Sequence, residues 1–239
     1  MWNDAKALNQ LASALIAVAV LLLLYAAGWR IAQLDAFALR EIRITNPVQH
    51  VTREQVEAVV FGELRGNFFT VDLAATRAAF EKLSWVRRVD VNRSWPDRVE
   101  VAVEEHVPIA HWGDAALVNA YGEVFAGASN QPMPLFEAPP GIAPEVVARH
   151  AAFERRLAAI GRTIYRMNVS ERRAWRIGLD DGMVIELGRD DVEARLANFV
   201  AAFDRTVATL DGGSTHVDLR YPNGFAVRVK GMRWKDGPA

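Results

Sequence analysis

SWVRRVDVNRSWPDRVEVAVEE, residues Ser84–Glu105, predicts two strands joined by a tight turn. Apolar residues alternate with polar ones on both sides of that turn, at Val89, Val91, Val99, Val101 and Val103. A period of two is typical of strands with one buried face. Pro96 fixes φ at the turn. The segment therefore predicts a β-hairpin that packs on one side against a core.

Far upstream of the hairpin, an uncharged stretch predicts a membrane-spanning helix. The 23 residues between Lys6 and Arg30 carry no charge. As a helix they would extend roughly 34 Å, enough for a hydrocarbon core of about 30 Å. A cleaved signal peptide is the alternative, since Ala26 and Ala27 are small residues that a peptidase accepts. The weak basic region before the stretch and its length favour an uncleaved anchor.

Charge and cysteine content leave the orientation open and exclude several classes of protein. Arg30, Arg40 and Arg43 follow the span, which does not favour export of the large C-terminal part, although large domains cross regardless of such charges. The chain has no cysteine, so disulfide scaffolding and thiol catalysis are excluded. A net charge of −1 with dispersed basic residues argues against a nucleic-acid surface.

A first module is predicted between residues 37 and 107. Leu39–Ile44 alternates like a strand, and Thr52 precedes Gln55 at the spacing of a capping box that begins a helix. Asp72 can cap a second helix before the hairpin begins. The order strand, helix, helix, strand, strand predicts a small α+β unit with its helices against one sheet face.

The following residues predict a second module, a mostly antiparallel sheet with two helices. Turn residues place hairpins around Asn119–Gly122, Asp180–Gly182 and Pro222–Gly224. One helix is expected from Pro144, with apolar positions that continue to Ile164. In the second helix, Asp190 and Glu193 have capping-box spacing. The proline-rich residues 131–144 are expected to form an irregular loop.

No motif of catalysis or metal binding is present in the sequence. Glu104, Glu105 and His106 are adjacent, but on a strand Glu105 would point away from the other two. Asp180 and Asp181 precede a glycine and are typical of a turn rather than a carboxylate pair. The motifs therefore predict no catalytic residue, no cofactor and no metal.

Two features remain as candidate binding surfaces. The C-terminal strand Phe225–Val229 contains no proline, and a last strand is commonly a sheet edge whose free N–H and C=O groups can accept a partner strand. Arg172 and Arg173 precede Trp175 and form either a recognition patch or a solvated strand end.

These motifs together resemble the FtsQ/DivIB family of bacterial cell-division proteins. The resemblance extends over nearly the whole chain, from the N-terminal span to FALREIRI at 37–44, HVTREQV at 50–56, the W-P-D hairpin at 85–105, LVNAYGEVF at 117–125, residues 173–187 and VDLRYPNGFAV at 217–227.

The resemblance implies an α+β protein with one transmembrane helix and two periplasmic domains. Its expected parts are a short cytoplasmic tail at 1–6, a transmembrane helix at 7–29, a POTRA domain at 37–107, a β domain at 108–231 and a tail at 232–239. It implies a single-pass type II protein of the bacterial inner membrane, with a cytoplasmic N-terminus, located at the division septum. The implied role is a non-catalytic scaffold without a small-molecule substrate.

The resemblance also implies specific partners. FtsB, together with FtsL, is expected to bind the end of the β domain by strand addition, and other divisome proteins are expected to bind the POTRA domain around Val48–Val60 and the W-P-D hairpin. The corresponding binding residues here are Tyr221, Asn223, Gly224, Phe225, Val227 and Val229, with Arg172 or Arg173 as an electrostatic contact. The alternatives are a POTRA-containing chaperone or docking protein for transport, and an anchored hydrolase with a dispersed active site.

Overall fold

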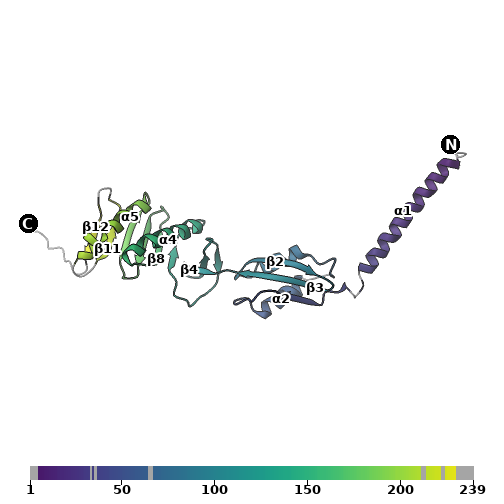
Figure 1. Ribbon diagram of the computed structural model, residues 1–239, viewed down its shortest axis with the longest axis horizontal. Helices are drawn as coiled ribbons and strands as arrows, with labels where there is room; N and C mark the ends of the chain where they lie inside the picture. The colour runs from purple at the N-terminus through teal and green to yellow at the C-terminus, as the bar shows by residue number, and fades with distance from the viewer. Residues whose placement is uncertain are drawn as a thin grey trace, which may run out of the picture. The chain divides into compact units, whose positions relative to one another are not determined.

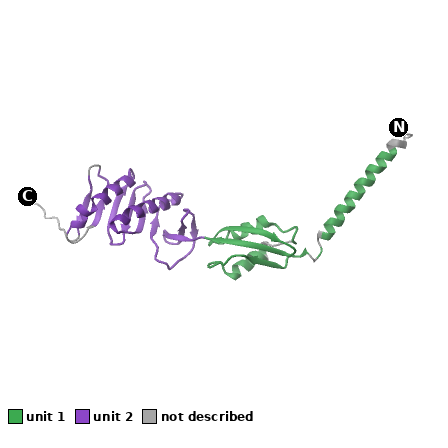
Figure 2. Ribbon diagram, viewed as in Figure 1, with its two compact units in different colours: residues 1–105 green, residues 106–239 purple. Residues whose placement is uncertain are grey.

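The computed structural model describes residues 5–32, 34, 37–63, 67–210, 214–221 and 224–229. The predicted tail at 232–239, most of the tail at 1–6 and the predicted binding residue Asn223 lie outside these ranges. The chain forms two compact units, residues 1–105 and 106–239 (Figures 1 and 2). Each unit is described by itself below.

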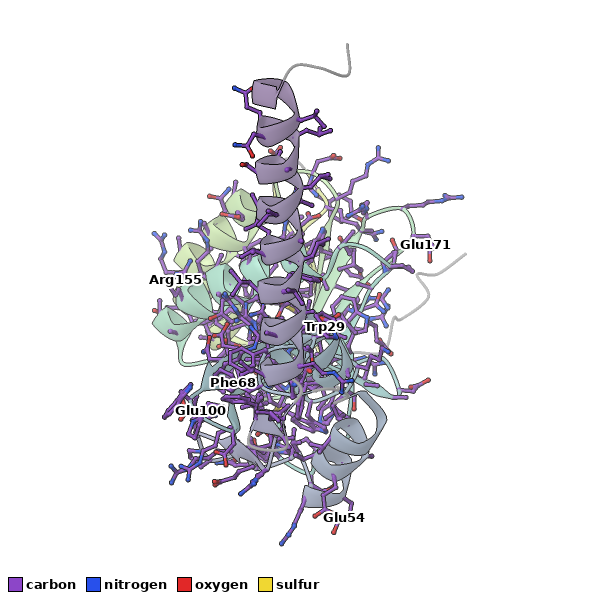
Figure 3. The ribbon with its side chains drawn as sticks, turned by 90° about the vertical axis from the view of Figure 1, so that its right-hand side faces the viewer. Trp29, Glu54, Phe68, Glu100, Arg155 and Glu171 are labelled. Atoms are coloured by element: carbon purple, nitrogen blue, oxygen red, sulfur yellow. The ribbon has the colours of Figure 1, made fainter. Side chains whose placement is uncertain are left out.

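The N-terminal helix α1 (Ala5–Ala32) is long and apolar enough to cross a membrane over Leu8–Ile31. None of that stretch is buried within the protein, and its side chains stand out all round the helix (Figure 3). Tyr25 and Trp29 stack on each other with ring centroids 6.4 Å apart, one turn from the end of the helix. Such a surface needs an apolar surrounding, which a bilayer provides.

The rest of the first unit has the predicted order of strand, two helices and two strands. Its elements are β1 (Glu41–Ile44), α2 (Arg53–Glu63), α3 (Leu73–Phe80), β2 (Val86–Ser94) and β3 (Arg98–Glu105). The sheet order is β1-β3-β2, in which β1 runs parallel to β3, and β2 is antiparallel to β3. The two strands of the hairpin are the neighbours β2 and β3, joined at a cis Trp95–Pro96 bond.

The core of this unit consists of the alternating valines of the hairpin. Val99 and Val101 are fully buried, and Phe80 from α3 is fully buried against them. The predicted capping box is present, since the Thr52 N–H donates to Gln55 Oε1 and the Gln55 N–H donates to Thr52 Oγ1. Asp72 Oδ1 accepts the N–H groups of Ala74 and Ala75 in the first turn of α3.

Glu105, the last residue of β3, fixes the loop before α2. Its carboxylate accepts the backbone N–H groups of Gln49, His50 and Val51 at 2.9–3.0 Å. Partial burial raises the pKa of the Glu105 carboxyl, but the three donors together outweigh burial and hold that pKa below its ordinary value. The His50 ring, which also contacts this carboxylate, stacks on Trp85 with centroids 3.7 Å apart. The Glu105 carboxylate thus connects the end of β3 to the loop that precedes α2.

Replacing Glu105 by glutamine should destabilise the first unit by about 1–2 kcal/mol at pH 7, because one acceptor oxygen becomes an N–H₂ group that faces backbone donors. Since the folded-state pKa is depressed, this contribution is complete above the unfolded pKa, near 4.3, and is lost as pH falls through the folded value. Thermal unfolding of a chain lacking residues 1–32, followed from pH 7 to pH 3, checks this expectation.

Glu104→Gln is the matched control for Glu105→Gln. The Glu104 carboxylate lies 2.7 Å from Arg87 Nη1 but is 51% exposed, so its loss should cost well under about 1 kcal/mol. Equal destabilisation by the two substitutions, or a difference that does not shrink at low pH, would contradict the role assigned to Glu105.

Within the described residues, the strands of the second unit form one nine-stranded sheet of order β12-β11-β10-β9-β8-β7-β4-β5-β6. Five of its eight neighbouring pairs are antiparallel, so the prediction of a mostly antiparallel sheet is confirmed. The strands are β4 (Pro108–Trp112), β5 (Ala116–Asn119), β6 (Val124–Ala126), β7 (Leu135–Glu137), β8 (Ile164–Val169), β9 (Trp175–Leu179), β10 (Val184–Gly188), β11 (Ser214–Asp218) and β12 (Ala226–Val229).

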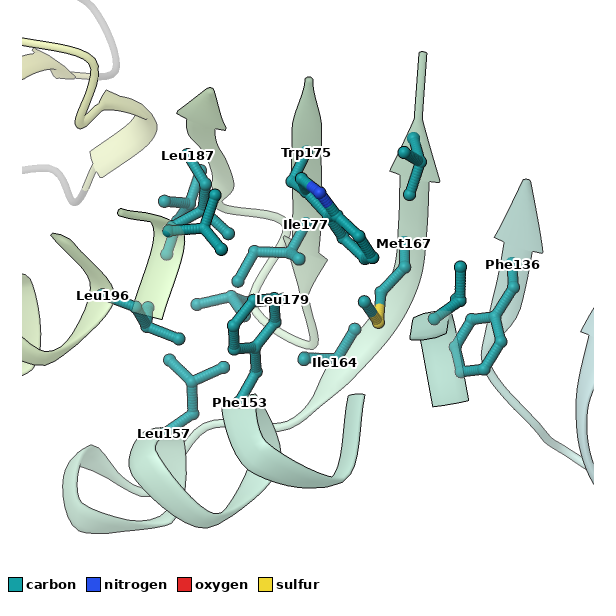
Figure 4. Close-up of a cluster of buried hydrophobic side chains, with 14 of the residues drawn as sticks. Phe136, Phe153, Leu157, Ile164, Met167, Trp175, Ile177, Leu179, Leu187 and Leu196 are labelled. Atoms are coloured by element: carbon teal, nitrogen blue, oxygen red, sulfur yellow. The ribbon is translucent and has the colours of Figure 1, made fainter. Parts of the chain in front are cut away.

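Two helices, α4 (Ala143–Leu157) and α5 (Val192–Ala202), pack on this sheet as expected. Figure 4 shows Phe153 and Leu157 of α4 pointing at the strand residues of the core. Phe153 meets the ring of Trp175 edge-on, with centroids 6.3 Å apart. Short 3₁₀ segments follow the helices at Ala158–Ile160, Phe203–Arg205 and Val207–Thr209.

Three local predictions for this unit are wrong. Ile164 does not continue the first helix but begins β8, because Gly161 takes a φ of +65° and ends the helical segment. The expected irregular loop at 131–144 contains β7, which lies between β4 and β8. The N-cap of α5 is Asp191 rather than Asp190, and its side chain forms no capping hydrogen bond.

Candidate partner-binding edge

The strand β12 ends the sheet order, as predicted for the C-terminal strand, and pairs with β11 on one side only. Within the described residues, no strand pairs with its other side. Phe225, Val227 and Val229 alternate along this segment as half-buried residues, while Ala226 and Arg228 are exposed. An open edge of this kind presents backbone groups that a further strand can pair with.

The strand register identifies which backbone groups face the open edge. The Leu219 N–H donates to Glu186 O of β10, so by alternation Val217 also faces β10, whereas Asp218 faces β12. Val217 lies opposite Val227, and Asp218 lies opposite Ala226. Ala226 therefore pairs with β11, and the N–H and C=O of Val227 point outward, together with those of Phe225.

The side chains of these outward-facing positions are anchored in the core. Phe225 and Val227 pack against the main cluster of buried residues, and the Phe225 ring meets Phe199 of α5 edge-on at 5.6 Å between centroids. This anchoring fixes the backbone of the edge. The edge is therefore ordered before any partner strand is added, which lowers the entropic cost of binding.

A groove of about 450 Å³ opens at the start of β12. Phe199 and Phe225 provide apolar walls, Asp191 and Arg195 provide charge, and Tyr221 and Gly224 form the rim. Tyr221 is 59% exposed, and a Cβ at Gly224 would meet no atom within 4 Å. The groove has room for one large side chain of a segment that pairs with β12.

An ion pair holds the residues that lead into this groove. The Arg220 guanidinium donates to both carboxylate oxygens of Asp218, at 2.8 and 2.6 Å, and the Arg220 N–H donates to the same carboxylate at 3.0 Å. These hydrogen bonds hold the pKa of the Asp218 carboxyl below its ordinary value. Tyr221 follows this fixed turn directly.

The structure distinguishes the two arginines of the predicted electrostatic contact. Arg173 adopts a left-handed backbone with φ of 62°, and its Nη1 lies 3.1 Å from Glu145 Oε2, so its charge is already paired. Arg172 is exposed, and no ion pair of its side chain occurs within the described residues. Arg172 is therefore the arginine available to an acidic group from outside.

Arg172 and the groove lie at the same end of the sheet. Trp175 of β9 lies opposite Gly188, at the end of β10. Asp218 of β11 lies opposite Glu186, near the same end of β10, and on its other side opposite Ala226 of β12. Three strand spacings of about 4.8 Å, or roughly 14 Å, separate β9 from β12. A partner segment of several residues can therefore reach from the edge strand to the Arg172 turn.

The residues first considered for chemistry have structural contacts instead. Glu104 pairs with Arg87, Glu105 binds the loop at 49–51, and His106 contacts Asn119 and stacks on Phe125 at 4.2 Å. Asp181 Oδ1 accepts the Met183 N–H in the predicted turn. Among the residues that the structure describes, no group of three or more His, Asp or Glu side chains could hold a metal ion.

Comparison with known proteins identifies the family. Residues 37–106 match the model of the POTRA domain, FtsQ-type, and residues 110–220 match that of the cell division protein FtsQ/DivIB, C-terminal. The chain belongs to the FtsQ/DivIB family. Proteins named cell division protein FtsQ from Nitrosospira multiformis and Burkholderia pseudomallei are 46% and 43% identical to it. The alignments cover 95% and 98% of this chain, and 99% and 96% of those proteins.

A third relative, the cell division protein FtsQ of Bordetella pertussis, is 35% identical over 96% of this chain and 93% of its own length. The predicted family and fold class are therefore confirmed. The chain has an N-terminal apolar helix, a POTRA domain and a mostly β domain with two helices. As a member of this family it has a role in cell division, and the one helix of the described residues that is long and apolar enough to cross a membrane agrees with a single-pass membrane protein.

Proposed function

We propose that this protein is a non-catalytic scaffold of the divisome that holds an FtsB/FtsL pair through the open edge of β12. An extended segment of FtsB adds to β12, places a large side chain in the groove between Phe199 and Tyr221, and presents an acidic residue to Arg172. The observation that carries the proposal is the outward-facing backbone at Phe225 and Val227, on an edge strand whose side chains are fixed in the core.

The proposal includes the placement of the chain. Residues 1–6 lie in the cytoplasm, 7–29 span the inner membrane, and the POTRA domain at 37–107 and the β domain at 108–231 lie in the periplasm, with 232–239 as a tail. The apolar helix at one end of the chain and the binding edge at the other support this arrangement, because periplasmic partners meet β12 while α1 retains the protein at the membrane.

A fluorescent protein fused to the N-terminus should gather at mid-cell in constricting cells, and depletion of the protein should produce filaments that do not divide. The competing function, a POTRA-containing docking protein for exported polypeptides, predicts fluorescence spread along the whole envelope and depleted cells of normal length. Fluorescence microscopy of growing cells separates the two. A uniform distribution together with normal division would exclude the divisome role.

A further inference from the structure

A second open edge occurs in the first unit, at β1. The sheet order β1-β3-β2 leaves one side of β1 without a paired strand in the part of the chain that the structure describes, apart from a single bridge between Ala38 and Asn67. The Thr45 N–H donates to Val101 O of β3, and the Val103 N–H donates to Asn46 Oδ1, so Val101 and Val103 face β1. With Ile44 opposite Val101 in the parallel register, the N–H and C=O groups of Glu41 and Arg43 therefore face β3, and those of Ile42 and Ile44 point to the open side.

An apolar groove of about 800 Å³ runs beside this edge, between β1 and α2. Its apolar lining includes Leu39, Ile42, Ile44, Val51, Val56 and Val60. The apolar residues of α2 at Val56, Val59 and Val60 are only half-buried. The helix therefore leaves part of its apolar face uncovered beside an unpaired strand, which is typical of an interaction surface.

We propose that a second copy of this chain covers this edge, by antiparallel pairing of β1 with β1 about a two-fold axis at Ile42. In this register Glu41 lies opposite the second copy's Arg43 and Arg43 opposite its Glu41, both on the exposed face of the sheet. The charges are complementary in both directions, as an isologous interface requires. In the same register the outward N–H and C=O groups of Ile42 exchange two hydrogen bonds with those of the second copy's Ile42.

The two-fold axis stands perpendicular to the joined sheets, so both α2 helices lie on the same face, one on each side of the seam. The half-buried stripes of the two helices then approach each other over the paired Ile42 side chains, and both grooves close together. This geometry accounts for the uncovered residues of α2 as well as for the free edge.

The position of β1 in the chain also favours a second copy as the occupant. Only residues 33–40 separate α1 from β1, and eight residues span at most about 28 Å. In two chains anchored in one bilayer by α1, the β1 strands therefore both start close to the membrane surface. This raises the effective concentration of one β1 strand near the other, relative to a partner that is not anchored in the membrane.

Cysteine crosslinking of the full chain in native membranes tests the proposal, because the sequence has no cysteine of its own. Ile42 lies opposite its own copy as a hydrogen-bonded pair, whose Cα atoms are about 5.5 Å apart, within the range in which a disulfide can form. Ile42→Cys should give a dimer under mild oxidation. Asn92→Cys, on the exposed face of the opposite edge strand β2, is the matched control and should stay monomeric.

Charge exchange in the Ile42→Cys background tests the register. Arg43→Glu places like charges opposite each other and should lower the dimer yield at least about tenfold, whereas Glu41→Arg combined with Arg43→Glu should restore it. Within one chain the double exchange is unfavourable. Glu41 pairs with Arg98 and Arg43 lies opposite Glu100, so after the exchange each of the two positions carries the same charge as its neighbour on β3. Restoration can therefore come only from the second copy.

Each outcome of this experiment decides the proposal. A dimer at residue 42 but not at 92, lost and restored by the charge exchanges, supports it. No dimer at 42, equal crosslinking at 42 and 92, a crosslink at 42 to a different protein, or failure of the double exchange to restore the dimer overturns it. The test is independent of β12, so the scaffold role can stand or fall separately.

Discussion

Val227→Pro should abolish co-purification of FtsB and FtsL while leaving the second unit folded. The Val227 N–H faces the open side of β12, so proline removes no hydrogen bond between β11 and β12. It removes a donor that an added strand needs, worth about 1 kcal/mol net, and its ring projects toward that strand. Because both effects act at the centre of a short edge, we expect binding to weaken at least about tenfold. Pull-down of FtsB and FtsL with the full chain measures this loss.

Val227→Ala is the control for that substitution. It removes the two methyl groups that pack against the core but keeps the N–H group, so partner binding should stay close to that of the unchanged protein. The thermal unfolding of both variants shows whether the second unit is intact. Wild-type binding by the folded proline variant would contradict strand addition at β12, and equal loss with alanine would assign the effect to packing.

The first unit could be predicted from the sequence because its signals are local. The alternating valines define the hairpin, and Thr52 and Gln55 satisfy each other across three residues. In the second unit, Ile164 continues a helical spacing that only the left-handed Gly161 interrupts. The short β7 pairs in parallel with β4 and β8, and nothing in its three residues indicates those distant partners. Non-local pairing therefore determined where prediction failed.

The candidate binding edge could likewise be predicted only in part, because some of its features depend on non-local pairing. The last strand could be predicted as an edge, but the outward direction of the Val227 N–H depends on the parallel pairing of β10 with β11, which follows a crossover through α5. The choice between Arg172 and Arg173 depends on Glu145, which lies at the start of α4 and forms an ion pair with Arg173. The sequence spacing of the two arginines contains no information about that contact.

Gly122→Ala should have the largest effect on the stability of the second unit. Gly122 closes the predicted turn between β5 and β6 with a φ of +78°, and its N–H donates to Asn119 O. A Cβ there would lie 2.4 Å from the Pro144 Cα at the start of α4, so the backbone of one segment must move. Left-handed strain and this clash together should cost about 3 kcal/mol or more, which lowers the melting temperature by about 10 °C.

Gly182→Ala separates the two contributions to that cost. Gly182 has a similar φ of +85° in the turn between β9 and β10, but a Cβ there would meet no atom within 4 Å. It should therefore show the conformational cost alone, about 1 kcal/mol and a decrease of about 3 °C. Thermal unfolding of chains lacking residues 1–32 compares the variants. Similar decreases would mean that the α4 terminus yields readily to the turn, and that Gly122 is required for its backbone conformation rather than for the close approach of Pro144.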